Sequence, residues 1–99
     1  MSLRRSGLQK DVLSLYRRAL RMVRTKPTIT QPKFLLFVRY SFRTQASSVA
    51  PRDVAAIEHL LRRGQRQLEM YEDKAVKDCQ VSQAMRVWEE EQQAARTTP

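Results

Sequence analysis

One stretch of the chain repeats apolar residues so regularly that it permits little other than a helix. Between positions 54 and 75, apolar or small residues alternate at steps of three and four, at Val54, Ile57, Leu61, Gly64, Leu68, Tyr71 and Ala75. This spacing forms a seam along one side of an α-helix, which is suited to packing against other helices. We therefore expect a helix here that begins near Pro51, since proline suits the first turn, and that packs between two others.

A helix is also predicted near the N-terminus, from about Gly7 to about Thr25. Apolar residues recur there at helical spacing, at Leu8, Val12, Leu15, Ala19 and Val23. Ser6 is a suitable N-cap. Pro27 ends the helix, because a residue that precedes proline disfavours the helical backbone. A basic stripe runs beside the apolar face, formed by Arg17, Arg21 and Arg24.

Residues 33–46, "KFLLFVRYSFRTQA", are predicted to form a helix between these two. Its apolar face would use Phe34, Phe37, Val38, Ser41 and Phe42. A strand is the competing interpretation, since the segment is rich in aromatic residues. The helix is preferred because no partner strand is apparent elsewhere in the sequence.

The chain is therefore assigned to the all-α class, as a three-helix antiparallel bundle with a helix-prone C-terminal extension. The bundle is expected to span residues 1–73, and the extension, a fourth helix or a detached tail, residues 74–99. A composition with 2 glycines, 4 prolines and 29% charged residues favours helices. The apolar run at 34–38 is far shorter than the roughly 20 residues that cross a bilayer, so no transmembrane segment is expected.

Positive charge is concentrated in the first two thirds of the chain. Residues 1–66 hold 15 Lys/Arg and 3 Asp/Glu, a net charge of +12, whereas residues 67–99 hold 4 and 7, a net charge of −3. Such a field attracts acidic partners, which include acidic proteins, anionic lipids, nucleic acids and negatively charged metal clusters. The arginines lie beside apolar stripes and no RNA-binding motif is visible, so nucleic-acid binding is the weaker alternative.

Residues that could carry chemistry directly are sparse. Cys79 is the only cysteine, which is typical of a reducing compartment. His59 has no second ligand near it in sequence, so no metal site is expected. No nucleophile with a base and no phosphate-binding loop is apparent, so the chain is predicted not to be an enzyme. The first ten residues contain Arg4, Arg5, Lys10 and no acid, which is compatible with mitochondrial import.

Several short motifs together indicate a family. The tripeptide Leu15-Tyr16-Arg17 has a phenylalanine downstream at Phe42, and "LQKDVLSLYRRALR", "KP", "VRYSFR" and "VAAIEHLLRRGQRQL" follow one another in that order. Over residues 8 to 68 these motifs resemble the LYR-motif family of small mitochondrial proteins. Within that family they are most similar to the branch of succinate dehydrogenase assembly factors.

The resemblance implies a three-helix bundle in the mitochondrial matrix that assists maturation of the iron–sulfur subunit of succinate dehydrogenase. It also implies an iron–sulfur co-chaperone as a partner. Family members commonly bind acylated mitochondrial acyl carrier protein, whose acyl-phosphopantetheine group enters the bundle, while no cofactor is bound directly. The alternative function is an LYR-type accessory subunit of a respiratory complex bound to acyl carrier protein.

Guanidinium groups suit carboxylates and phosphates, both of which an acidic carrier with a phosphopantetheine arm offers. A glycine inside a helix costs about 1 kcal/mol relative to alanine, so Gly64 is expected either to allow close helix packing or to leave room for an acyl chain. The predicted partner-binding residues are Leu15, Tyr16, Arg17, Arg18, Arg21, Phe42, Arg43, Arg62, Arg63, Gly64 and Arg66.

Overall fold

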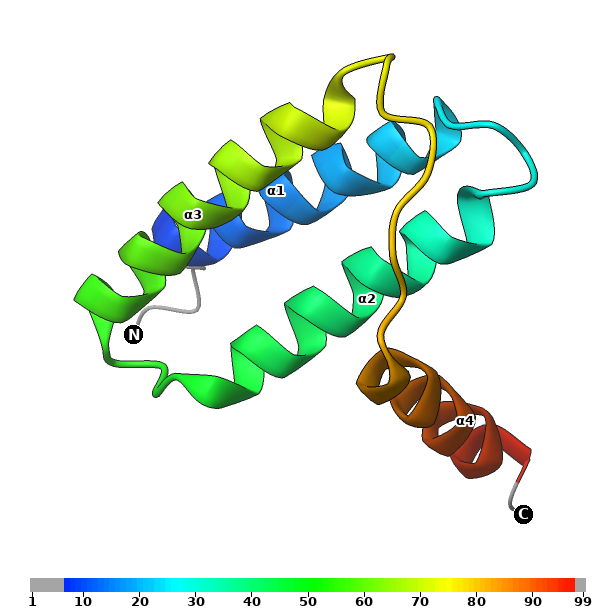
Figure 1. The fold of residues 1–99 in the computed structure, drawn as a ribbon. Coiled ribbons are helices and arrows are strands. Elements are labelled where there is room, and N and C mark those ends of the chain that lie inside the picture. Colours follow the sequence, from blue (N-terminus) through cyan, green and yellow to red (C-terminus); the bar gives the residue numbers. More distant parts are fainter. Residues whose placement is uncertain (1–6, 98–99) are drawn as a thin grey trace.

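The computed structural model describes residues 7–97 and contains four helices in that range (Figure 1). They are α1 (Gly7–Arg24), α2 (Gln31–Ser48), α3 (Val54–Glu72) and α4 (Gln83–Thr97). No strand occurs among the described residues, so the all-α class is confirmed and the strand alternative for the second segment is wrong. The predicted count of three is corrected, because the helix-prone extension forms the fourth helix. The predicted N-cap Ser6, and Arg4 and Arg5 of the import signal, lie outside the described residues.

The helix ends are set by local chemistry. Thr25 closes α1 by donating from its hydroxyl to the Met22 carbonyl oxygen at 2.6 Å. The predicted start of α3 near Pro51 is wrong, because Pro51 lies in the preceding turn. The Asp53 carboxylate caps the helix instead, accepting from the backbone N–H of Ala56 at 3.1 Å.

Helix α1 is the central helix of the bundle. It packs against both α2 and α3, whereas α2 and α3 share no comparably extensive contact. The chain runs up, down and up again, so that α2 is antiparallel to α1 and α3 (Figure 1). The expectation that the third helix lies between the others is therefore wrong. The reason is the width of the apolar face, since α1 buries Leu15, Ala19, Met22 and Val23 while α3 buries only Leu68.

The main core lies where α1 meets the first half of α2 and the end of α3. Phe34 is fully buried at its centre and lies edge-on to Tyr71, with ring centroids 6.1 Å apart. Tyr71 also contacts Phe37, with centroids 5.3 Å apart. These aromatic contacts join α2 to α3 at one end of the bundle, near the α1–α2 loop.

A buried lysine fastens the segment that follows α3. Lys26 is only 5% exposed, and its ammonium donates to the carbonyl oxygens of Asp73 at 3.1 Å and Val76 at 2.6 Å. The same ammonium lies 5.3 Å from the centre of the Phe34 ring. Residues 73–82 then cross α2 and lead into α4 (Figure 1). We refer to this segment as the strap.

Among the extensive helix–helix contacts, the one that involves α4 is with α2. Trp88 lies edge-on to Tyr40 of α2, with ring centroids 5.8 Å apart. Leu36 is 6% exposed yet lies outside the main core cluster, as expected for a side chain covered from the α4 side. Ser82 accepts the backbone N–H of Met85 at 3.2 Å and so caps α4.

Candidate functional site: an apolar groove flanked by arginines

The splay between α2 and α3 leaves a cavity of about 700 Å³. Helix α1 forms its floor, and α2 and α3 form its walls. We refer to it as the groove. It extends from the turn between α2 and α3, at Val49, Pro51 and Val54, to the contact of Phe37 with Tyr71. Its volume falls within the range of about 300–1,000 Å³ that is common for small-molecule sites.

The lining of the groove is almost entirely apolar, and no charged side chain contributes to it. Polar side chains are few: Gln9, Ser41, Gln45, Gln67 and the Tyr71 phenol. Burial raises the pKa of Tyr71, and the nearby Cys79 adds to this, so its hydroxyl remains neutral at physiological pH. A groove of this composition favours an uncharged, mostly hydrocarbon ligand.

Gly64 and Leu15 set the separation of α1 and α3 along this groove. A Cβ at Gly64 would lie 3.0 Å from Cδ2 of Leu15, which is tighter than ordinary van der Waals contact. Both residues line the groove, and Leu15 is 8% exposed. Glycine therefore allows the helices to approach closely at a position where a larger residue would displace Leu15 or narrow the groove.

The tyrosine of the tripeptide and the downstream phenylalanine are brought together. Tyr16 is half-buried on α1 and lies edge-on to Phe42 of α2, with ring centroids 4.9 Å apart. Phe42 is itself half-buried and lines the groove. This pair therefore joins α1 to the α2 wall, as Leu15 and Gly64 join α1 to the α3 wall.

Arg18 is engaged within the chain. Its Nε and Nη2 donate to the two carboxylate oxygens of Glu72 at 2.9 and 2.7 Å, a two-point contact between residues 54 positions apart. This hydrogen bond holds the pKa of Glu72 below its usual range, and the charges of Arg18 and Arg21 contribute. A contact of Arg18 with a partner remains a prediction, and it would compete with Glu72.

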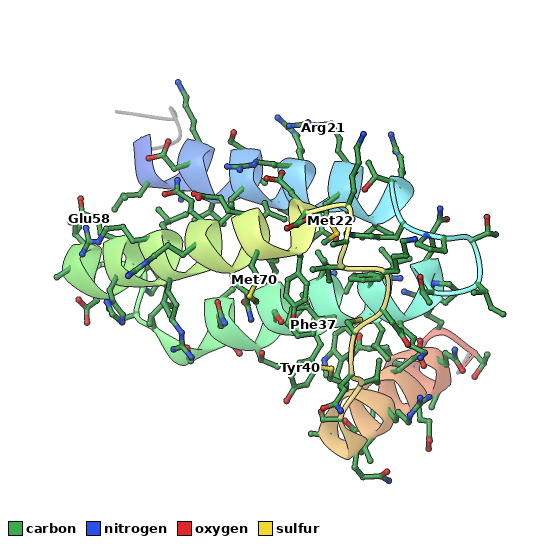
Figure 2. The ribbon with its side chains drawn as sticks, turned by 45° about the horizontal axis from the view of Figure 1, so that its top comes forward. Arg21, Met22, Phe37, Tyr40, Glu58 and Met70 are labelled. Atoms are coloured by element: carbon green, nitrogen blue, oxygen red, sulfur yellow. The ribbon has the colours of Figure 1, made fainter. Side chains whose placement is uncertain are left out.

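The other predicted arginines are exposed and lie on different faces. Arg17 and Arg21 project from the outer side of α1, and Figure 2 shows Arg21 pointing outward while Met22 points toward the other helices. Arg43 is exposed on α2. Arg62, Arg63 and Arg66 are exposed on α3, with Nε of Arg66 donating to the Arg62 carbonyl oxygen at 3.4 Å. The structure therefore distributes these arginines over three helices and does not gather them at one place.

Two groups of residues have roles in the structure that the sequence did not predict. Lys26 belongs to the first group, because no sequence pattern marks a lysine whose acceptors are backbone carbonyls about 50 residues away. The α2 wall residues Phe37 and Gln45 were not recognised as site residues either. Their positions on the apolar face of the predicted helix were the available signal.

Within residues 7–97, no three residues among His, Cys, Asp and Glu are grouped so that they could hold a metal ion. Cys79 is half-buried, and burial together with the charge of Asp78 raises the pKa of its thiol, so it is a poor nucleophile. None of the described helices combines the length and apolar character required to cross a membrane.

The fold and the groove define a small all-α protein with an apolar ligand-sized cavity and exposed basic faces. Residues 10–70 match the family model described as Complex 1 protein (LYR family), and the chain belongs to this family. The match covers α2 and nearly all of α1 and α3, and it excludes α4.

Individual curated proteins match the chain over more residues than the family model does. The chain is 42% identical over 77 residues to the mitochondrial succinate dehydrogenase assembly factor 1 of Schizosaccharomyces pombe, covering 78% of this chain and 96% of that protein. It is 44% identical over 73 residues to assembly factor 1A of Dictyostelium discoideum, covering 72% and 79%. It is 50% identical over 68 residues to assembly factor 1 of Bos taurus, covering 68% and 52%. No solved structure matches the chain significantly.

Proposed function

We propose that this protein is a mitochondrial assembly factor for succinate dehydrogenase, acting in the matrix on the iron–sulfur subunit. The observation that carries the proposal is the shared name of its relatives, which match it over about 70–80% of its length at 42–44% identity. The net charge of +9 fits a client whose thiolate-ligated clusters are anionic. The protein acts by binding rather than by catalysis, and the iron–sulfur co-chaperone is a second partner.

We further propose that acylated mitochondrial acyl carrier protein binds the same chain and inserts its acyl chain into the groove. The volume of about 700 Å³ and the uncharged lining support a hydrocarbon occupant. A phosphopantetheine arm carries a phosphate, which an arginine beside the groove would bind by two-point hydrogen bonds. Acyl-phosphopantetheine is thus supplied by the partner and is not a cofactor of this chain.

Affinity purification of the full chain from mitochondria, followed by intact-mass measurement of co-purifying proteins, tests both statements. We expect the iron–sulfur subunit of succinate dehydrogenase together with an acyl carrier protein whose mass includes an acyl thioester. Absence of the iron–sulfur subunit would contradict the assembly role, and recovery of unacylated carrier alone would contradict insertion into the groove.

The same preparation separates an assembly factor from an accessory subunit of a respiratory complex. An assembly factor should be found with the immature iron–sulfur subunit and be missing from purified mature complex II. Stoichiometric presence of the chain in a mature respiratory complex would instead favour the accessory-subunit function.

A further inference from the structure

The groove is open at one end and closed at the other. Near the turn between α2 and α3 its lining residues Pro51 and Val54 are exposed, Val54 by 51%. At the opposite end Met22, Val38 and Leu68 line it, and each of them is 5% exposed or less. A hydrocarbon chain that lies along the groove therefore buries most surface when its tip points toward the closed end.

Two aromatic rings form the closed end. Phe37 comes from α2 and Tyr71 from α3, and their ring centroids are 5.3 Å apart with the planes inclined by 67°. Both rings line the groove and both are half-buried. The pair bridges the two walls, so the groove ends at a contact between side chains and not in solvent.

The core holds these rings in place. Phe34 is fully buried and lies edge-on to Tyr71, with ring centroids 6.1 Å apart. The Lys26 ammonium lies 5.3 Å from the centre of the Phe34 ring and donates to the carbonyl oxygen of Asp73, two residues after Tyr71. A ligand that extends past the pair must therefore displace packed side chains, which is unfavourable in a well-packed core.

The open part of the groove has a definite length. Its lining runs along α1 from Leu8 to Met22, which at 1.5 Å per residue is about 21 Å. Because the lining is almost entirely apolar, each methylene group that a ligand buries there should strengthen binding by up to about fourfold. This gain stops where the tip of the ligand reaches Phe37 and Tyr71.

We propose that the Phe37–Tyr71 pair sets the longest acyl chain that the groove accepts. The inference rests on the proposed function, because it takes the acyl chain of the carrier as the ligand, and it adds which residues select among chains of different length. Chains that end before the pair gain affinity with every added methylene group. Longer chains gain none, since the extra methylene groups displace the rings or stay in water.

The test measures the dissociation constant between the full chain and acyl carrier protein that carries either no acyl chain or a saturated chain of eight to eighteen carbons. For the wild type, affinity should rise with chain length and then stop rising at one length, which we refer to as the break. Phe37→Ala and Tyr71→Ala each remove one ring of the closed end. Each should move the break to a chain at least about two carbons longer.

A substitution at Ser41 should move the break in the opposite direction. Ser41 is half-buried, lines the groove and lies one helical turn from Phe37 on the side of the open end. A leucine at this position would occupy volume that the tip of the acyl chain uses, so Ser41→Leu should shorten the break by at least about two carbons. This variant fills space and creates no cavity, so it tests the inference even if Phe37→Ala fails to fold.

Tyr40→Ala is the matched control. It removes an aromatic ring from the same helix, three residues from Phe37, but the Tyr40 ring contacts Trp88 of α4 and does not line the groove. The break should stay at the wild-type length in this variant. Far-UV circular dichroism and the melting temperature show whether each variant folds.

The inference is overturned if the break stays at the same length in every folded variant of Phe37, Tyr71 and Ser41. A wild-type affinity that rises steadily through the longest acyl chain would overturn it as well. Equal affinity for carriers with and without an acyl chain would instead contradict insertion into the groove, which belongs to the proposed function and is a different outcome.

Discussion

The rings of Tyr16 and Phe42 meet edge-on, with their centroids 4.9 Å apart and their planes inclined by 72°. Tyr16 is the central residue of the tripeptide, and Phe42 lies on the facing helix. The contact fixes the α2 wall of the groove against α1, so both residues contribute to the fold whatever partner they meet.

Loss of either ring should destabilise the bundle. Tyr16→Ala and Phe42→Ala should each lower the free energy of unfolding, and a double-mutant cycle should give a coupling of about 0.5–1.5 kcal/mol from the ring contact. Urea unfolding followed by circular dichroism measures these values. Tyr16→Phe keeps the ring and should leave stability nearly unchanged, and a coupling near zero would contradict a direct contact.

The side chain of Leu15 should limit the size of the residue that can replace Gly64. Gly64→Ala gains about 1 kcal/mol of helix propensity and should stay within about 1 kcal/mol of the wild type, because the tip of Leu15 can shift into the groove. Gly64→Leu should lower the unfolding free energy by about 1–3 kcal/mol through overpacking. In a Leu15→Ala background the penalty of Gly64→Leu should shrink. An equal penalty in both backgrounds would show that another neighbour limits this position.

Lys26, which holds the strap in place, should contribute more to the stability of the fold than Lys33, whose ion pair is exposed. Lys26→Met keeps the apolar stem and removes both hydrogen bonds to the carbonyl oxygens, which should cost about 1–3 kcal/mol. Amide hydrogen exchange in residues 73–82 should also become faster. Lys33→Met, which removes the exposed contact with Asp78, is the control and should change stability less than Lys26→Met does.

The Arg18–Glu72 ion pair should make the stability of the fold depend on pH. The pKa of Glu72 in the folded state lies below its ordinary value of 4.5. The ion pair therefore contributes fully to the stability of the fold at neutral pH. This contribution is lost as the pH falls below about 4.5 and through the folded-state pKa. Because the two side chains are 38% and 34% exposed, the contribution should be about 1 kcal/mol or less. Melting temperatures of wild type and Glu72→Gln should differ at pH 7 and converge near pH 3. A constant difference across this range would exclude the pair as the cause.

Helix α4 should detach without unfolding the bundle. Trp88→Ala removes the ring that contacts Tyr40, so hydrogen exchange in residues 83–97 should approach that of a free peptide while α1 and α3 remain protected. Val87→Ala, at a neighbouring position that is 43% exposed, should change little. Loss of protection throughout the chain would show that α4 supports the core.

The features predicted best from sequence depend on neighbouring residues. Pro27 marks the end of α1, and the α3 seam correctly places Leu61, Gly64 and Leu68 toward the bundle. What the sequence did not reveal depends on contacts between distant segments. The central position of α1 follows from the breadth of its apolar face in three dimensions. No local pattern indicates the pairing of Arg18 with Glu72, because the partners are 54 positions apart.

The contacts of Lys26 have a practical consequence for fragment design. A polypeptide cut immediately after α3 would lose the Asp73 and Val76 carbonyls and leave the buried Lys26 ammonium without either of these acceptors. It would also lose the side chains of Val76 and Cys79, which pack against the core. The shortest autonomous fragment should therefore retain residues through at least 79, whereas removal of the following terminal helix, which contributes no residue to the groove, should leave the groove intact.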